Sequence, residues 1–205
     1  MKIKDLKQYN DISKLETLED GKLIGPALFD FSQIFECNHC YFEKLEMEPC
    51  CFKNISCYDV VFKNCDFSNV VWNDNTSFAG DVLRSVLFDN CKMVGTDFGM
   101  MHLKKVKFQN CVGRYMNFSF ATLKEVQMEN CNFQNMILQE TICKKLTIED
   151  NKLENMEVLH TDLKGVDMST NQIDGLKTDL KSIEGMVVST EQAIALSKLL
   201  KIVIK

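Results

Sequence analysis

Large apolar residues recur at every fifth position along most of the chain. Between Leu83 and Ile183, 19 of the 21 residues at this spacing are apolar, whereas the overall apolar content of 45% would give about nine. An earlier run in a different phase comprises Phe42, Met47, Phe52, Cys57, Phe62, Phe67 and Trp72. A period of five fits neither an amphipathic helix nor a continuous strand.

A second uncharged column lies two residues before these centre positions. From Val86 to Leu176 it contains only Val, Cys, Thr, Met, Ala, Leu and Asn. Two residues in five therefore point inward, and the other three face water. Short extended pieces separated by turns produce this pattern, because alternate side chains of a strand share a face.

A longer repeat, of twenty residues, shows that four five-residue units make one coil. The segments VLFDNC (86–91), VKFQNC (106–111) and VQMENC (126–131) follow one another at intervals of twenty residues. Residues twenty apart would then stack as neighbouring strands do, about 4.8 Å apart. Asn90, Asn110, Asn130 and Asp150 fall at one expected corner, where Asn and Asp tolerate turn geometry. The sequence predicts an all-β solenoid with a square cross-section.

One coil is longer than the others. The segment VVFKNC (60–65) lies 26 residues before VLFDNC, which leaves six extra residues between Trp72 and Leu83. A one-residue insertion followed by an ordinary repeat, TSFAG, is an alternative, but it would lose the match of VVFKNC at several columns. We therefore expect a loop formed by Asn73, Asp74, Asn75, Thr76, Ser77, Phe78, Ala79 and Gly80.

The two ends depart from the five-residue rule. We expect an N-terminal cap segment at 1–34, the solenoid at 35–185 and a C-terminal helix and strand at 186–205. Ser189 and Gln192 have capping-box spacing, and Ala193, Leu196 and Leu200 form an apolar stripe along a helix at 190–200. This unit caps one chain or joins two chains, because open strand edges at a solenoid end invite pairing.

The composition bears on where the protein resides, on the state of its cysteines and on whether it has a metal or catalytic site. No window of 18 apolar residues and no signal-peptide core occur, so we expect a cytoplasmic protein. The ten cysteines are then read as reduced, buried side chains. CNHC (37–40) with Cys50 and Cys51 has zinc-like spacing, but its cysteines fall mainly on inward columns. We expect no metal, no cofactor and no catalytic residue, and hence no enzyme.

Several units resemble pentapeptide repeats, namely CDFSN (65–69), TDFGM (96–100), CNFQN (131–135) and TDLKG (161–165). The resemblance implies a right-handed quadrilateral β-helix over about residues 35–185. NCDFSNVVW (64–72), LKGVDMSTNQIDGL (163–176) and STEQAIALSKLLKIVI (189–204) are similar to segments of Qnr-type quinolone-resistance proteins of Gram-positive bacteria. That narrower resemblance implies a protein that binds DNA gyrase or topoisomerase IV, shields it from fluoroquinolones, mimics duplex DNA and dimerises through its C-terminus.

The resemblance assigns residues to these roles. The 73–80 loop would contact the topoisomerase, or would be a tolerated insertion with no function. Asp89, Glu129 and Glu149 share one outward column, and spaced carboxylates there can replace DNA phosphates. The full acidic set comprises Asp89, Glu129, Glu149, Asp162, Asp167 and Asp174. The expected dimer contacts are Leu196, Leu199, Leu200, Ile202 and Ile204.

The charge balance departs from that of a simple DNA mimic. The net charge is only −5, and residues 83–124 carry two acids against seven bases, including Lys104, Lys105, Lys107, Arg114 and Lys124. Such a basic belt would face an acidic surface or merely solvent, and we expect no direct nucleic-acid contact. A scaffold or immunity protein that binds another protein or a toxin is the alternative function.

Overall fold

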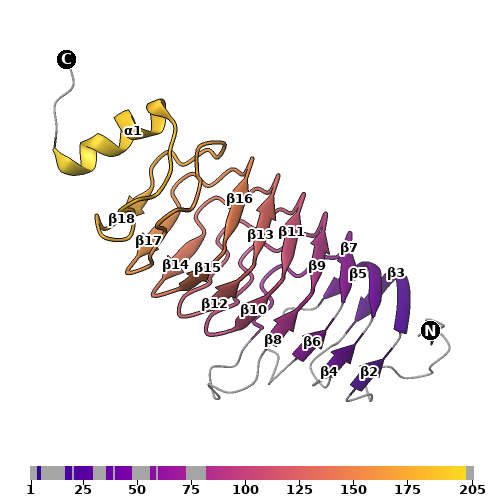
Figure 1. The fold of residues 1–205 in the computed structure, drawn as a ribbon. Helices are drawn as coiled ribbons and strands as arrows, with labels where there is room; N and C mark the ends of the chain where they lie inside the picture. Colours follow the sequence, from indigo (N-terminus) through magenta and orange to yellow (C-terminus); the bar gives the residue numbers. More distant parts are fainter. Residues whose placement is uncertain are drawn as a thin grey trace.

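The chain forms a parallel β-solenoid whose coils are stacked along one axis (Figure 1). The computed structural model describes residues 4–5, 17–19, 21–29, 36–38, 40–47, 56–58, 60–72 and 82–201. All strand pairs among these residues are parallel, as expected when each coil rests on the preceding one. This confirms the fold class expected from the five-residue period.

Three sides of the solenoid are β-sheets. The first contains β1 (Lys4–Asp5), β3 (Gly21–Phe29), β5 (Tyr41–Met47), β7 (Val61–Lys63), β9 (Leu87–Asp89), β11 (Lys107–Gln109), β13 (Gln127–Glu129) and β16 (Thr147–Glu149). The second contains β2 (Thr17–Glu19), β4 (Glu36–Asn38), β6 (Ser56–Tyr58), β8 (Val82–Arg84), β10 (His102–Lys104), β12 (Thr122–Lys124) and β15 (Ile142–Lys144). The third contains β14 (Ile137–Gln139), β17 (Glu157–Leu159) and β18 (Lys177–Thr178).

The fourth side is a ladder of single bridges. Lys92 pairs with Val112, and the ladder continues through Asn132, Lys152 and Gln172. The corners between sides are left-handed residues at every fifth position, such as Lys105, Asn110, Tyr115 and Phe120. Asn was expected there, but bulky residues also adopt this conformation, at about 1–2 kcal/mol each, because stacking between coils holds the turn in place.

The spacing between partner residues locates the long coil. Phe62 pairs with Phe88 and Cys57 pairs with Leu83, both across 26 residues, whereas Phe88 pairs with Phe108 across 20. The difference, 26 − 20, gives six additional residues in that coil. Val71 still pairs with Asp97 across 26 residues, and Val82 pairs with His102 across 20. The six residues therefore enter between Val71 and Val82.

Aromatic rings stacked from coil to coil fill the described core between Phe42 and Phe118. Phe42, Phe62, Phe88 and Phe108 form one stack with centroids 5.2, 5.2 and 5.0 Å apart. Trp72, Phe98 and Phe118 form a second stack with separations of 5.4 and 5.3 Å. Met128 continues the first stack above Phe108, as the centre column predicts.

Polar side chains at the second inward column bind backbone carbonyls of the coil before. The Cys111 thiol donates to Phe88 O at 3.4 Å, and the Thr141 hydroxyl donates to Phe118 O at 2.8 Å. Asn151 Nδ2 donates to Met128 O at 2.9 Å. Each donor lies 23 residues after its acceptor, so this column requires a small side chain that can donate a hydrogen bond or a purely apolar one.

The sheets extend into the expected cap segment. β2 and β3 lie within residues 1–34. They pair in parallel with β4 and β5, respectively, so they continue the ladders of the second and first sheets. The boundary at residue 34 is thus not an edge of the sheets. Figure 1 shows these indigo strands at the opposite end of the rod from α1 (Thr190–Ser197). A capping role for 1–34 remains a prediction.

Replacing Phe108 with aspartate should unfold the middle coils. The ring is completely buried between Phe88 and Met128, and a carboxylate there would have neither water nor a partner. We expect a loss of more than about 4 kcal/mol in the free energy of unfolding, measured by urea denaturation. Gln127→Asp is the control, because Gln127 is exposed on the neighbouring strand. A Phe108→Asp protein as stable as the control would contradict the placement.

Candidate functional site

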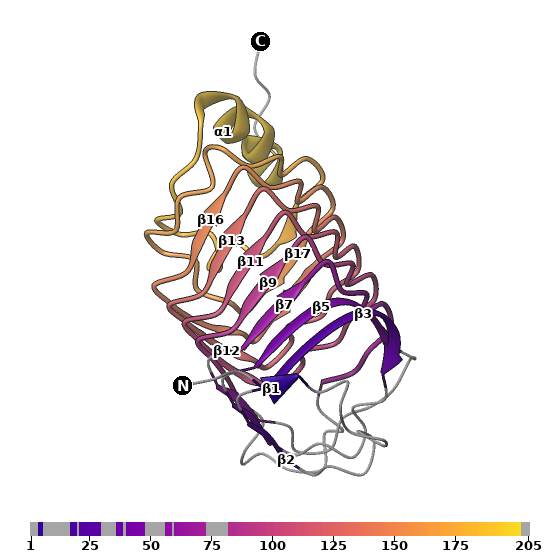
Figure 2. The same ribbon diagram turned by 90° about the vertical axis from the view of Figure 1, so that its right-hand side faces the viewer.

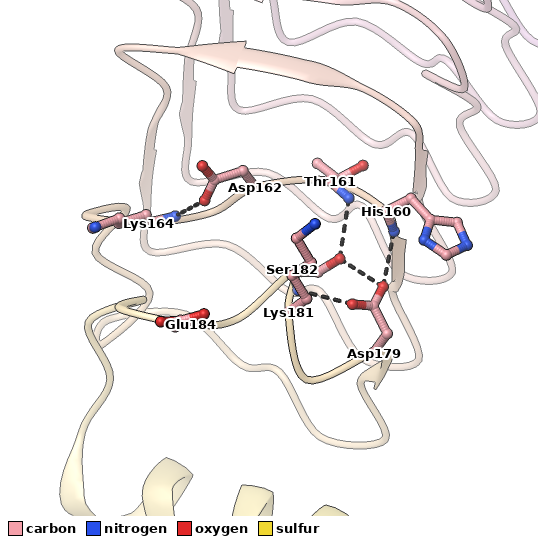
Figure 3. Close-up of a pocket in the computed structure, with 8 residues that line it drawn as sticks. All are labelled: His160, Thr161, Asp162, Lys164, Asp179, Lys181, Ser182 and Glu184. Atoms are coloured by element: carbon pink, nitrogen blue, oxygen red, sulfur yellow. Dashed lines mark hydrogen bonds between the residues drawn. The ribbon is translucent and has the colours of Figure 1, made fainter.

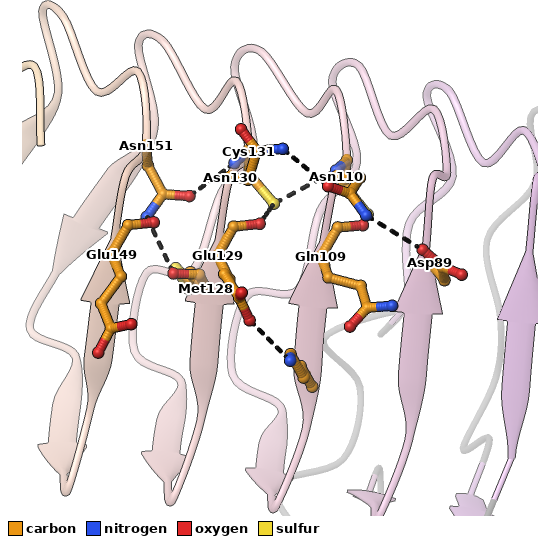
Figure 4. Close-up of polar contacts among 11 residues, drawn as sticks. Asp89, Gln109, Asn110, Met128, Glu129, Asn130, Cys131, Glu149 and Asn151 are labelled. Atoms are coloured by element: carbon orange, nitrogen blue, oxygen red, sulfur yellow. Dashed lines mark hydrogen bonds and ion pairs between the residues drawn. The ribbon is translucent and has the colours of Figure 1, made fainter.

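The predicted acidic column is a continuous ladder on the first sheet. Asp89, Gln109, Glu129 and Glu149 are direct partners on β9, β11, β13 and β16, and all four point outward (Figure 4). Figure 2 shows these four strands side by side along one face of the rod. The five-residue period therefore correctly placed three carboxylates and one amide in a single row.

Polar neighbours hold two carboxylates of this row. Lys107 Nζ lies 2.7 Å from Glu129 Oε2, and Asn110 Nδ2 donates to Asp89 Oδ1 at 3.5 Å (Figure 4). Asn130 Nδ2 donates to Asn110 Oδ1 at 2.8 Å, so the corner asparagines also form a ladder. Asp89 and Glu129 are thus held by neighbours, and the ammonium of Lys107 offsets part of the negative charge of the row.

The other three predicted acids lie apart from the row. Asp167 is on the same side at the neighbouring outward position, and Asp174 follows Glu154 on the side made of single bridges. Asp162 is one coil beyond Ile142, on the second sheet's side. The structure thus brings together three of the six acidic residues named from the sequence and distributes the rest over three sides.

Two of these acids have a local structural role. Asp162 Oδ1 accepts the Lys164 N–H at 2.8 Å, and Asp167 Oδ1 accepts the Ser169 N–H at 2.9 Å. Hydrogen bonds from the hydroxyl and backbone of Ser169 hold the pKa of Asp167 below its usual value. This contact two residues ahead explains part of the repeat's preference for Asp and Asn, and our sequence reasoning did not identify it.

The expected loop and part of the expected dimer contact lie outside the described residues. Asn73, Asp74, Asn75, Thr76, Ser77, Phe78, Ala79 and Gly80 are among them, as are Ile202 and Ile204. The structure describes the strand pairing on either side of these residues, and the register of that pairing gives the six-residue excess. A contact between this loop and a partner remains a prediction.

The C-terminal helix has the cap that the sequence predicts. The Ser189 hydroxyl accepts the Gln192 N–H at 3.3 Å, and Gln192 Oε1 accepts the Ser189 N–H at 2.8 Å. Gln192 also attaches the helix to the solenoid, because its Nε2 donates to the carbonyls of Met168 and Asn171 at 2.9 and 2.7 Å. The capping glutamine thus fixes the helix against the last coils.

The apolar side chains of this end are mostly uncovered. α1 is followed by the short helix η3 (Lys198–Leu200), and Leu196 is half-buried, whereas 51% of Ile194 and 55% of Leu200 are exposed. A cavity of about 490 Å³ lies between the helix and the coil of Ile173 and Leu176. The stripe of Ala193, Leu196 and Leu200 is therefore not a buried face of one chain.

The basic belt inferred from the sequence does not exist as one surface. Lys104 and Lys124 are direct partners on the second sheet, together with Arg84 and Lys144. Lys107 lies on the first sheet, and Arg114 lies on the bridge side beside Tyr115, 5.7 Å from its ring. Comparing the residue that follows each inward centre residue at intervals of twenty would have identified this column.

A second cavity, of about 440 Å³, lies at the corner formed by His160 and the last coil (Figure 3). Asp179 organises it by accepting hydrogen bonds from the His160 N–H at 2.8 Å and from the N–H and hydroxyl of Ser182 at 2.9 and 2.7 Å. These bonds hold the pKa of Asp179 well below its usual value. The carboxylate is therefore occupied in closing the coil.

The cysteines near the expected zinc-like motif are only partly described. Cys40 is buried and Cys37 pairs with Cys57 in the second sheet, while Cys50 and Cys51 lie outside the described residues. Within the described part of the chain, no three His, Cys, Asp or Glu residues form a cluster able to hold a metal ion. No helix in that part is long and apolar enough to cross a membrane.

Comparison with known proteins finds a similarity for the middle of the chain. Residues 82–158 match the family model of a pentapeptide repeat region. This segment is therefore similar to pentapeptide repeats over less than half of the chain. Among curated proteins, none matches the chain in sequence.

The chain is also similar to several solved structures, at low identity and with low TM-scores. A trypsin-treated form of QnrB1, a plasmid-mediated fluoroquinolone resistance protein, is 19% identical, with 93% of this chain and 92% of that chain covered and a TM-score of 0.35. HetL, which is involved in heterocyst differentiation regulation in the cyanobacterium Nostoc, is 12% identical, with 84% and 89% covered and a TM-score of 0.37. These likenesses do not assign a function.

Proposed function

We propose that this protein binds DNA gyrase or topoisomerase IV without catalysing a reaction, and protects the enzyme from fluoroquinolones by partial DNA mimicry. The observation that carries the proposal is the register of Asp89, Gln109, Glu129 and Glu149 on four successive strands. The similarity of 64–72, 163–176 and 189–204 to Qnr-type segments supports this choice of partner.

The charge spacing of the row resembles one strand of DNA more than a duplex. Three steps of about 4.8 Å separate Asp89 from Glu149, which gives about 14 Å. One DNA strand carries about four phosphates over that distance, and a duplex carries about eight. The row supplies three carboxylates, and Lys107 pairs with one of them. Electrostatic complementarity is therefore partial, and binding needs further contacts.

The 73–80 loop and the C-terminus supply these contacts in our proposal. The six additional residues lie between Val71 and Val82, whose partners keep the register of the ladder, and loops on rigid scaffolds commonly carry binding residues. At the other end, Ile194, Leu199 and Leu200 are exposed, and Leu199 also lines the cavity beside α1. We propose that this apolar end joins two copies through Leu196, Leu199, Leu200, Ile202 and Ile204. The dimer would be a longer rod with two acidic rows.

Leu200→Asp should convert the proposed dimer into a monomer. A carboxylate at this exposed apolar position would have to be desolvated in the interface, whereas in the monomer it faces water. Sedimentation velocity at micromolar concentration measures the change. Thr190→Asp, also exposed but at the beginning of α1, should remain a dimer. A wild-type protein that sediments as a monomer would contradict the proposal.

Neutralising the acidic row should weaken protection of the enzyme. Glu129→Gln combined with Glu149→Gln keeps side-chain shape but removes two charges, and we expect half-maximal rescue to need about fivefold more protein. The measurement is DNA supercoiling by gyrase in the presence of ciprofloxacin, with and without the purified protein, at two salt concentrations. Rescue by wild type should decrease more steeply with salt than rescue by the variant.

The matched control removes two carboxylates from another side. Glu140→Gln combined with Glu157→Gln changes the net charge equally, and neither residue is on the first sheet. Equal losses in both double variants would indicate a general charge effect and contradict a role for the row. Failure of wild type to rescue either gyrase or topoisomerase IV at any concentration would favour the alternative of a scaffold or immunity protein.

Deleting residues 74–79 should separate binding from folding. The deletion restores a 20-residue coil, and the loop-closure entropy changes by less than about 1 kcal/mol. We expect the midpoint of thermal unfolding to move by less than about 3 °C while rescue of supercoiling weakens. An unfolded deletion protein would show that these residues are needed for the fold, and a folded one with undiminished rescue would show that they do not contact the enzyme.

A further inference from the structure

A straight row of cations follows the second sheet along the rod. Arg84, Lys104, Lys124 and Lys144 are direct partners on β8, β10, β12 and β15. Lys164 lies twenty residues beyond Lys144. The adjoining corner adds Lys105 and Lys145, both left-handed and exposed. We call these seven residues the basic ridge: Arg84, Lys104, Lys105, Lys124, Lys144, Lys145 and Lys164.

The charges of the basic ridge are largely unneutralised by the described part of the chain. The two ion pairs found among the described residues, Lys92 with Asp66 and Lys107 with Glu129, lie on other sides. The outward positions beside the ridge contain few acids, chiefly Glu125 at the corner, Asp162 near its end and Glu184, which lines the same cavity as Lys164. Asp162 accepts the backbone N–H of Lys164. A positive strip therefore persists on a protein whose net charge is −5.

We propose that the basic ridge binds the phosphate backbone of duplex DNA. Four steps of about 4.8 Å from Arg84 to Lys164 give a length of about 19 Å. One strand of a duplex presents about five or six phosphates over that length, and the main row supplies five cations. Flexible Lys stems accommodate the difference in spacing, while the β-ladder keeps the row straight. The ridge thus matches an extended, uniformly charged ligand.

Two features of the ridge favour a duplex over other polyanions. From residue 84 to residue 145, the two columns that form it contain no aromatic side chain on which the bases of a single strand could stack. Six of the seven cations are lysines, which bind phosphate as point charges on flexible stems and require no fixed bidentate geometry. A sequence-independent contact with the backbone of stacked DNA fits both features, and competition by an acidic polypeptide tests the alternative.

This binding would be independent of topoisomerase protection, because it uses a different side of the rod. The ridge lies on the second sheet and at its corner, whereas the acidic row lies on the first sheet. Loss of one activity therefore need not accompany loss of the other. This proposal also replaces the expectation of no nucleic-acid contact. That expectation rested on the overall charge and on a basic segment whose lysines and arginines the fold places on different sides.

Titration of the full-length protein with a fluorescent 25-base-pair duplex tests the inference. Anisotropy measured between 50 and 200 mM salt should give a slope of log K against log salt of about −4. Lys104→Gln, Lys124→Gln and Lys144→Gln together should reduce the magnitude of this slope by nearly 3 and weaken binding at least about tenfold at 50 mM salt. A second duplex of unrelated sequence should bind equally well.

The control is an equal loss of charge elsewhere. Lys152→Gln, Lys177→Gln and Lys198→Gln together neutralise three exposed lysines on other sides and on η3, and this variant should keep the wild-type slope. Thermal unfolding checks that both triple variants are folded. Absence of duplex binding at 50 mM salt, equal losses in both variants, tighter binding of a single strand, or equal competition by polyglutamate would overturn the proposal.

Discussion

The structure depends on one constraint, the fixed register of each coil on the coil before it. Strand pairing, ring stacking and the bonds from inward Cys, Thr and Asn side chains all connect residues separated by constant numbers of positions. A coil of another length can be accommodated only if its excess leaves the ladder and the register resumes afterwards. The chain meets this condition between Val71 and Val82, where the separation of partners changes from 26 to 20.

The same register determines the surface. Outward residues twenty apart become neighbours. The charge and polarity of each face are therefore determined by residues at that interval and not by consecutive residues. Asp89, Glu129 and Glu149 form a row although they are distant in sequence. Lys105 and Lys107 are close in sequence, but one lies at a corner and the other on the first sheet.

The fold could be predicted because the inward columns have almost no exceptions. Phe88, Phe108 and Met128 were placed correctly, as were the acidic row and the capping box. Other features could not be predicted from the five-residue pattern. The left-handed conformation of Phe120 is imposed by neighbouring coils, and the bonds from Gln192 to Met168 and Asn171 depend on where the helix lies on the last coil. The basic ridge could have been predicted from the sequence by comparing residues twenty apart. Counting the lysines of one continuous segment instead combined residues that lie on different sides.

The first sheet is bordered by opposite charges along its two long edges. The corner with Lys105 and Lys145 runs along one edge, and the column ending in Glu129 and Glu149 runs along the other. The rod therefore has an electric dipole across its short axis that is repeated in the middle coils. In the field of a charged partner such a body experiences a torque about its long axis, so it would be rotated into alignment before the surfaces touch.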